Sequence, residues 1–119
     1  MAELNSSHAA QVSMVVELLQ GKWTVLILCA MRNGPVRLSE LKYLIPSASK
    51  KALTSSLRSL QAARVVLRRD LSGSLLHVEY EVEEEMREPL VALLDHLAEW
   101  GELYGSNTEG TISRPSISE

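Results

Sequence analysis

Basic and hydroxyl-bearing side chains gather between residues 49 and 58, where they could bind a polyanion. Lys51, Ser55 and Arg58 are spaced by three and four positions, so on an α-helix they share one face. A lysine contacts phosphate as a point charge, and an arginine can donate two hydrogen bonds to one guanine. No Asp or Glu interrupts the stretch. These residue types at this spacing predict contacts with nucleic-acid phosphates and base edges.

Two short amphipathic helices are predicted to present this face, from Leu38 to about Ile45 and from Ser49 to about Ala63. Pro46 ends the first, because proline disfavours helical geometry in the residue before it and lacks a backbone N–H. The Ser49 hydroxyl is placed to cap the second helix. Leucines at i, i+4 and i+7 mark the buried side of that helix: Leu53, Leu57 and Leu60. The pair predicts a helix-turn-helix whose second helix enters a DNA major groove.

A β-hairpin is predicted behind the two helices, with one strand over Val65–Asp70 and the other from Leu75 or Leu76 to Val82. The second strand alternates apolar and polar residues, its apolar positions being Leu76, Val78, Tyr80 and Val82. Residues 71–74 form the expected turn, in which Gly73 is the natural site for a positive φ. A hairpin at this place is the wing of a winged helix-turn-helix.

Two further helices are predicted before this unit, over Ala9–Leu19 and Lys22–Arg32. The second is apolar almost all round, so we expect it to be the most buried element, with Cys29 as a small buried hydrophobe. Oxidation sensing through Cys29 is the alternative, and it requires an exposed thiol beside positive charge. Asn33 and Gly34 suit a left-handed C-cap. The residues before Ala9 are expected to be disordered.

A long apolar helix is predicted from about Glu84 to Tyr104, although Pro89 favours a regular start nearer Arg87. A domain of this size already has its core helices, so we expect the apolar stripe to pair with a second copy of the chain; folding back onto its own domain is the alternative. The predicted homodimer interface combines residues of the first and last helices: Val12, Val15, Val16, Leu19, Leu90, Leu94, Leu97, Trp100 and Tyr104. Residues 105–119 are polar and aperiodic, and are predicted to form a disordered tail after one ordered domain of about residues 10–104.

The composition is that of one soluble domain of 119 residues, 45% hydrophobic and 23% charged. No apolar run approaches the roughly 20 residues of a membrane helix. The N-terminus lacks a signal-peptide pattern, so a cytoplasmic protein without membrane contact is expected. His8, His77 and His96 lack metal-ligand spacing, and one cysteine cannot complete a structural zinc site. Because phosphate-loop, nucleophile-elbow and dinucleotide patterns are also missing, we expect no metal, no cofactor and no enzyme activity.

The net charge of −3 hides an uneven distribution of charge along the chain. Residues 22–69 contain ten Lys or Arg residues and a single acid, Glu40, whereas acids dominate from Asp70 onward. A basic middle and an acidic final third predict a positive face on a protein that is acidic on average. The alternative is a set of solvated helix faces that are basic without function.

Four stretches together resemble the HxlR-type winged-helix transcription regulators: GKWTVLIL, GPVRLSELKYLIPSASKKALTSSLRSL, HVEYEV and LLDHLAEWG. The resemblance spans about Leu18–Gly101. It implies a mostly α fold with a small hairpin wing, in a cytoplasmic bacterial or archaeal dimer joined by N- and C-terminal helices. Several members of that family respond to electrophiles or oxidants, often through a cysteine before the first helix. This chain has no cysteine in the matching region, residues 7–11, and has Ala63 or Arg64 where a glycine is common between recognition helix and wing.

The sequence thus predicts a sequence-specific regulator, a repressor, that binds double-stranded DNA as a homodimer on a palindromic operator and responds to a small-molecule effector. Lys51, Ser55 and Arg58 are expected at base edges. The full predicted DNA-binding set comes from the helix pair and the wing: Arg37, Lys42, Ser49, Lys50, Lys51, Thr54, Ser55, Arg58, Arg68, Arg69, Ser72, Gly73 and Ser74. A winged-helix protein-interaction module and a small-molecule-sensing dimer without DNA binding are the alternatives.

Overall fold

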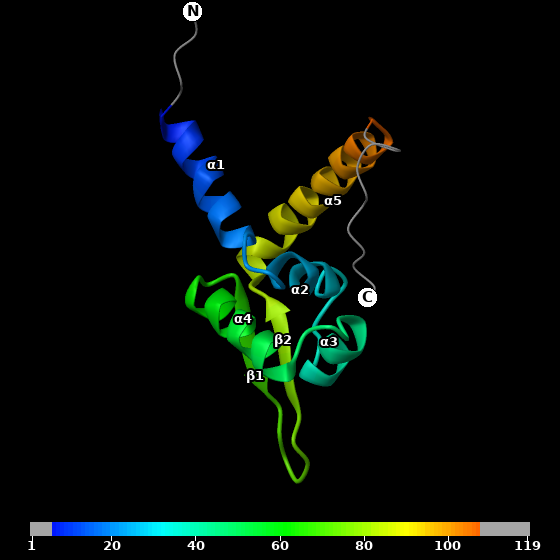
Figure 1. Ribbon diagram of the computed structural model, residues 1–119. Coiled ribbons are helices and arrows are strands. Elements are labelled where there is room, and N and C mark those ends of the chain that lie inside the picture. The colour runs from blue at the N-terminus through cyan, green and yellow to red at the C-terminus, as the bar shows by residue number, and fades with distance from the viewer. Residues whose placement is uncertain (1–5, 108–119) are drawn as a thin grey trace, which may run out of the picture.

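The structure, a computed structural model, describes residues 6–107 and is shown in Figure 1. In chain order its elements are α1 (Ser6–Leu19), α2 (Thr24–Ala30), α3 (Leu38–Leu44), α4 (Lys50–Ala62), β1 (Val66–Asp70), β2 (Val78–Val82) and α5 (Glu84–Asn107). The predicted fold class, mostly α with a small hairpin wing, is confirmed. Residues 6–8 and 105–107 are helical, so the prediction of disorder there is wrong. The expectations for residues 1–5 and 108–119 lie outside the described residues.

The core lies where α2, α3, α4 and the hairpin meet, and these elements form the head of the molecule. Its fully enclosed side chains come from all of them: Ile27, Leu28, Leu41, Leu53, Leu57, Leu60 and Val66. The predicted leucine stripe on α4 is therefore confirmed. Enclosing a leucine-sized side chain contributes about 1.5–3 kcal/mol. This cluster fixes the orientation in which the head presents the opposite, polar face of α4.

The buried surface of α2 is a single face rather than its whole circumference. Thr24, Ile27 and Leu28 are buried, as is Met31 just beyond the helix, and these positions follow helical spacing. Cys29 lies off that face and is exposed, so the prediction that it is buried is wrong. A helix that is apolar all round does not reveal which side the core will cover. Gly34 has a positive φ, +145°, but the predicted left-handed C-cap at this place is wrong, because α2 ends sooner, at Ala30, with Met31 as its C-cap.

The connection between α3 and α4 is tied down by side chains of both helices. At the start of α3, the backbone N–H of Arg37 donates to Glu40 Oε1 at 2.7 Å. Lys42 Nζ donates to the carbonyl oxygens of Pro46 and Ala48, both at 2.8 Å. The Ser49 hydroxyl oxygen accepts the backbone N–H of Ala52 at 3.0 Å, which confirms the predicted N-cap of α4. The first of these bonds caps the start of α3. The others satisfy carbonyl groups between α3 and α4, and an N–H group in the first turn of α4, that have no partner within a helix.

The C-terminus of α4 is closed by a Schellman pair of hydrogen bonds. The N–H of Val65 donates to Leu60 O and the N–H of Arg64 donates to Gln61 O, each at 3.0 Å. This geometry requires a left-handed residue, and Arg64 has φ +63°. Val65 and Leu60 are both buried, which is the hydrophobic contact that usually accompanies this cap. Arg64 thus occupies the place where the resemblance implied glycine.

The two strands form an antiparallel ribbon in which Val66 pairs with Val82 and Arg68 with Tyr80. Val36 adds a short bridge to Tyr80, with reciprocal backbone bonds of 2.8 Å. β2 begins at Val78, later than predicted, because residues 71–77 form a wide loop instead of a four-residue turn. Gly73 consequently does not adopt the predicted positive φ; among the described glycines only Gly34 does.

α5 begins at Glu84 and runs through Pro89, so the expected start near Arg87 is wrong. Proline removes the N–H that would bond to the carbonyl of Glu85, but residues 84–89 are exposed and water can satisfy that oxygen. Farther along, α5 is anchored to the head by Leu94, which is buried, and by Asp95, which pairs with Arg32 at 2.5 Å.

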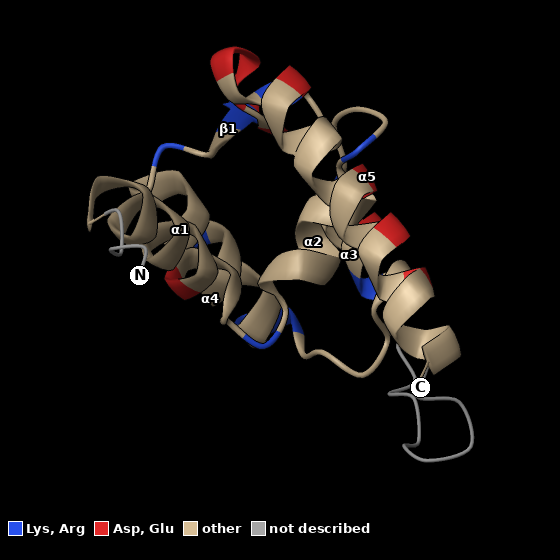
Figure 2. Cartoon of the chain, turned by 90° about the horizontal axis from the view of Figure 1, so that it is seen from above, with Lys and Arg blue, Asp and Glu red and all other residues tan. Residues whose placement is uncertain are grey.

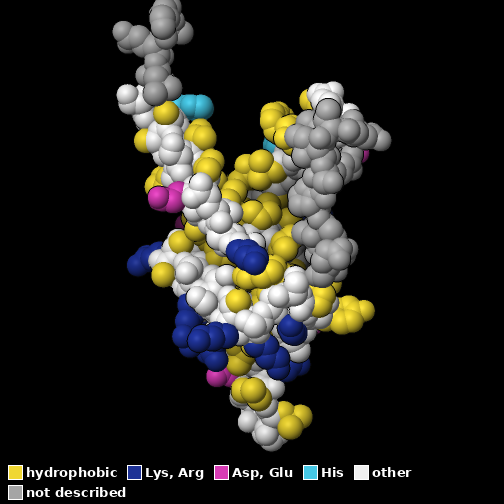
Figure 3. Space-filling view, in the orientation of Figure 1, with side chains coloured by type: hydrophobic (Ala, Val, Ile, Leu, Met, Phe, Trp, Pro, Cys, Tyr) yellow, Lys and Arg dark blue, Asp and Glu magenta, His cyan; other side chains and the backbone are white. Residues whose placement is uncertain are grey.

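α1 and the C-terminal part of α5 project from the head as two arms of a V (Figure 1). No side chain of α1, which is described over its whole length, is fully buried. Hydrophobic side chains are gathered on the inner sides of the V (Figure 3). Taken singly, none of the described helices has the length and apolar character needed to cross a membrane; α1 and α2 together pass that test, with an 85° bend between them.

Candidate nucleic-acid interface

The exposed face of α4 brings five of the predicted residues together. Lys50, Lys51, Thr54, Ser55 and Arg58 line one shallow depression on the surface of the head. The leucine stripe on the other side of the same helix holds them outward. The side chains of Lys50, Lys51 and Arg58 form no hydrogen bond or ion pair with any other residue that the structure describes. Their charges and donors are therefore available to a ligand.

A second depression joins this face to the wing. Its polar lining consists of Arg37, Ser39, Lys50 and Arg68, and its apolar lining of Leu38, Leu76, Val78 and Tyr80. Lys50 belongs to both depressions, so the two form one continuous surface. Figure 3 shows Lys and Arg side chains clustered over this part of the head, above the tip of the hairpin. Figure 2 shows that the acidic residues lie largely along α5 instead.

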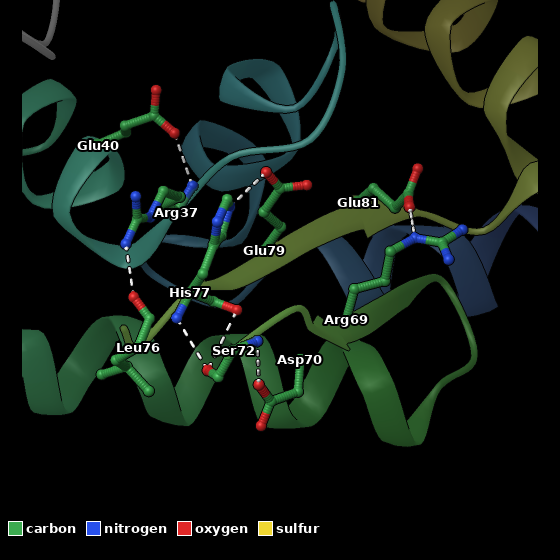
Figure 4. A network of polar contacts seen from close by, with 9 residues as sticks. All are labelled: Arg37, Glu40, Arg69, Asp70, Ser72, Leu76, His77, Glu79 and Glu81. Carbon is green, nitrogen blue, oxygen red and sulfur yellow. Dashed lines mark hydrogen bonds and ion pairs between the residues drawn. The ribbon is translucent and has the colours of Figure 1, made fainter. Parts of the chain in front are cut away.

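The two neighbouring arginines of β1 have different surroundings. Arg68 lines the depression beside α4, whereas Arg69 donates to the carboxylate of Glu81 (Figure 4). Arg87 Nη2, from α5, donates to the other carboxylate oxygen of Glu81 at 3.0 Å. The hydrogen bond from Arg69 is the main cause that lowers the pKa of Glu81, and the bond from Arg87 adds to it. Successive strand residues face opposite sides, so only Arg68 joins the surface formed by α4.

Lys42 is also separated from that surface by its partners. Its ammonium group is held by the carbonyl oxygens of Pro46 and Ala48, inside the connection between α3 and α4. The sequence contained a signal for this role, since the residues after a proline-terminated helix leave carbonyls without helical partners. The DNA contacts predicted for Lys42 and Arg69 stay predictions, but the structure gives both side chains internal partners.

The loop of the wing is ordered by its own polar groups (Figure 4). Asp70 Oδ1 accepts the N–H of Ser72 at 2.9 Å, and the Ser72 hydroxyl oxygen accepts the N–H of His77 at 2.8 Å. Hydrogen bonds from Ser72 lower the pKa of Asp70. His77 Nε2 contacts Glu79 Oε2 at 2.9 Å. Ser72, Gly73 and Ser74 are exposed, and so are the leucines around them, Leu71, Leu75 and Leu76, for which no site role was predicted.

Neither Cys29 nor a metal cluster contributes to this surface. Cys29 lies on α2 and is exposed, but the side chains around it remove part of the hydration of its thiol, which raises the pKa of the thiol against the opposing charge of Arg32. A raised pKa leaves less thiolate, which is the reactive form, at neutral pH. Within residues 6–107, no three His, Cys, Asp or Glu side chains are grouped so that they could hold a metal ion.

Comparison with known proteins places the chain in a family. A model of the HxlR-like helix-turn-helix family matches residues 18–109. An uncharacterized HTH-type transcriptional regulator of Methanothermobacter thermautotrophicus is 32% identical over 107 residues, which cover 90% of this chain and 81% of that protein. The uncharacterized HTH-type transcriptional regulator YtcD of Bacillus subtilis is 41% identical over 90 residues, 76% of this chain and 71% of YtcD.

Solved structures agree with the sequence relatives. The crystal structure of YtcD matches with a TM-score of 0.72 and 39% identity, over 78% of this chain and 94% of that one. HypR, described as a redox regulator, matches in its reduced form with a TM-score of 0.73 and 30% identity, over 83% of this chain and 94% of that one. The chain therefore belongs to the HxlR-like helix-turn-helix family and is a DNA-binding transcriptional regulator.

Proposed function

We propose that the protein is a homodimeric repressor that recognises a palindromic operator, with α4 in the major groove and the wing beside it. The observation that carries this proposal is the unobstructed polar surface of α4. Five side chains that can contact phosphates and bases line one depression there, and Lys50 connects it to the depression beside the wing. The same surface supports contact with double-stranded DNA more directly than contact with a protein, because its free groups are cations and hydroxyls spaced along one helix.

The contacts divide by position on the head. Lys51, Ser55 and Arg58, from the exposed face of α4, read base edges. Lys50, Thr54 and Ser49 lie toward the N-terminus of that helix and contact the flanking backbone. Arg37 and Arg68, which line the second depression, neutralise phosphates without reading sequence. Lys42 and Arg69 contribute less in this proposal, because each is held by partners away from this surface. Arg37 also has an internal partner, the carbonyl oxygen of Leu76, but that residue lines the same depression.

The two arms supply the dimer interface. Val12 and Val16 on α1 are about half exposed, and Trp100 on α5 is 66% exposed. The Trp100 and Tyr104 rings stack on the same arm, with centroids 5.9 Å apart and planes inclined by 7°. Leu19, Leu90 and Leu94 lie nearer the head and are already partly or fully covered. Apolar surface of this extent on two projecting helices supports association with a second copy.

Regulation in this proposal acts through the same arms. A small-molecule effector that changes how two protomers associate would change the distance between their two α4 helices, and so the fit to an operator. The protein is cytoplasmic in this scheme, and its function is binding rather than catalysis.

A selection experiment tests the proposal. The wild-type protein is expected to recover one palindromic sequence from a random pool of DNA duplexes. With that duplex, Arg58→Ala should weaken binding by about 5- to 150-fold and relax the preference at one base pair, since an arginine contact discriminates by about 1–3 kcal/mol. Lys22→Ala is the matched control, because it removes an exposed cation outside both depressions. Recovery of no common sequence, or equal affinity of Arg58→Ala and wild type, would contradict the proposal.

A further inference from the structure

We propose that Leu75 and Leu76, at the tip of the wing, enter the minor groove of the operator as an apolar wedge that unstacks one base step on each side of the palindrome. This inference rests on the proposed function, and it assigns to the wing a contact that neither the charged residues nor the serines of the loop can make.

The tip of the wing is apolar and exposed. Leu75 is 80% exposed and Leu76 is 78% exposed, and the side chain of Leu71 is also largely open to water. In Figure 3 hydrophobic side chains appear at the end of the hairpin, below the cluster of cations. The whole segment Leu71–Leu76 contains no Lys, Arg, Asp or Glu. It therefore offers no charge for phosphates, and its recognition chemistry is confined to apolar contact and the serine hydroxyls.

The leucines are held in this position by the backbone. Leu71 N donates to His77 O at 2.7 Å, and Gly73 N donates to Leu75 O at 3.1 Å. Arg37 Nη2, from the start of α3, donates to Leu76 O at 3.3 Å (Figure 4). A loop with these bonds presents its side chains outward instead of folding them toward the core. Because the loop is already ordered, it loses less conformational entropy when it binds.

The surroundings of the tip favour DNA over other partners. Leu76 lines the same depression as Arg37, Lys50 and Arg68, so a duplex whose phosphates meet those cations brings its groove to the leucines. A second copy of the chain placed tip to tip would bring the two sets of cations together, and like charges at short range repel. Charge complementarity and continuity with the α4 surface thus both point to the duplex.

The chemistry of the minor groove suits this arrangement. Its walls are sugar C–H groups, and proteins that bind there often insert apolar side chains between base pairs, which unstacks them and kinks the duplex. Pyrimidine–purine steps are the easiest to unstack. We therefore expect the wedge to select such a step in the sequence that flanks each half-site, at a position that no side chain reads by hydrogen bonding.

The test uses the duplex that wild-type protein recovers from the random pool, with 2-aminopurine substituted at successive flanking positions. Wild type should raise the 2-aminopurine emission at one step in each half-site, because the fluorescence of that base increases when it loses its stacking partner. The double variant Leu75→Ser with Leu76→Ser should lose this emission and bind about tenfold more weakly. Leu44→Ser is the matched control, because it removes an exposed leucine from α3.

The outcomes separate this inference from the function on which it rests. If Arg58→Ala loses affinity while wild type raises no emission at any flanking step, the wedge is refuted and the function stands. The wild-type readout does not depend on how the variant folds. Equal affinity of the leucine double variant and wild type would also refute the wedge. A change in the mass of the double variant without DNA would instead assign the tip to contacts between copies. Recovery of no common sequence refutes both proposals.

Discussion

The head and the arms of this molecule expose different chemistry to water. On the head, Lys50, Lys51 and Arg58 lie over a core in which Leu53, Leu57 and Leu60 are enclosed. On the arms, large apolar side chains are exposed, among them Val12, Val16 and Trp100, and α1 has no buried side chain beneath them. Water solvates an exposed cation well, so a cation is stable without a partner. Exposed apolar surface is unfavourable in water until another surface covers it. The head is therefore suited to a partner that binds reversibly, and the arms to a partner that stays bound.

The largest expected effect comes from a charge placed in the apolar surface of the arms. Trp100→Asp places a charge in the apolar stripe of α5, and we expect the proposed homodimer to dissociate. Operator affinity should then fall by about 100-fold or more, because two linked heads bind far more tightly than one. Light scattering at micromolar concentration measures the mass, and titration of the labelled operator measures the affinity. Ala92→Asp is the control, since it adds the same charge to an exposed position outside the predicted stripe. A Trp100→Asp protein that remained a dimer would assign the apolar stripe another role.

A smaller effect is expected where the wing is linked to α5. Glu81→Gln weakens two charge-assisted bonds, from Arg69 and Arg87, to a carboxylate that is buried. We expect the free energy of unfolding to fall by about 1 kcal/mol, because both arginines are half exposed and solvent screens their charge.

The pH dependence gives this prediction a sign. The folded-state pKa of Glu81 is lowered relative to its unfolded value, so its contribution is present above the unfolded pKa and is lost as pH falls through the folded pKa. Denaturant titrations at neutral and acidic pH should therefore show a smaller difference between wild type and Glu81→Gln at the acidic end. A difference that is constant with pH would mean that the charge of Glu81 does not stabilise the link.

The smallest expected effect concerns the junction between α4 and the wing. Arg64→Gly should raise the free energy of unfolding by about 0.5–1 kcal/mol, because glycine adopts φ +63° without the steric cost that an arginine side chain carries. Ala63→Gly is the control and should lower it, since Ala63 has an ordinary helical φ of −80°. Thermal unfolding compares the three proteins. Neither change should alter the mass that light scattering measures, because both residues lie in the head and outside the proposed interface of the arms.

The parts of the head that the sequence predicted well are those whose signals lie close together along the chain. The leucine spacing of α4 identifies its buried face, and Ser49 identifies its start, because both signals lie within a few residues of each other.

The parts that the sequence predicted poorly depend on contacts between distant residues. Cys29 lies on a helix that is apolar all round, so only the packed structure decides which side is covered. The roles of Lys42 and Arg69 depend on the carbonyls and the carboxylate that they meet. Leu76 continues the alternation of β2 in the sequence, yet it lies in the wide loop because pairing ends at Val78.

The uneven charge of the chain also has a consequence for encounter with DNA. Ten basic residues and one acid occupy residues 22–69, while the rest of the chain supplies the acids that make the total −3. Such a molecule is an electric dipole whose positive end is the head. In the field of a polyanion it experiences a torque as well as a weak net repulsion, and both act over a Debye length of about 8–10 Å. This torque favours encounters in which the head faces the duplex over encounters that begin with α5 foremost.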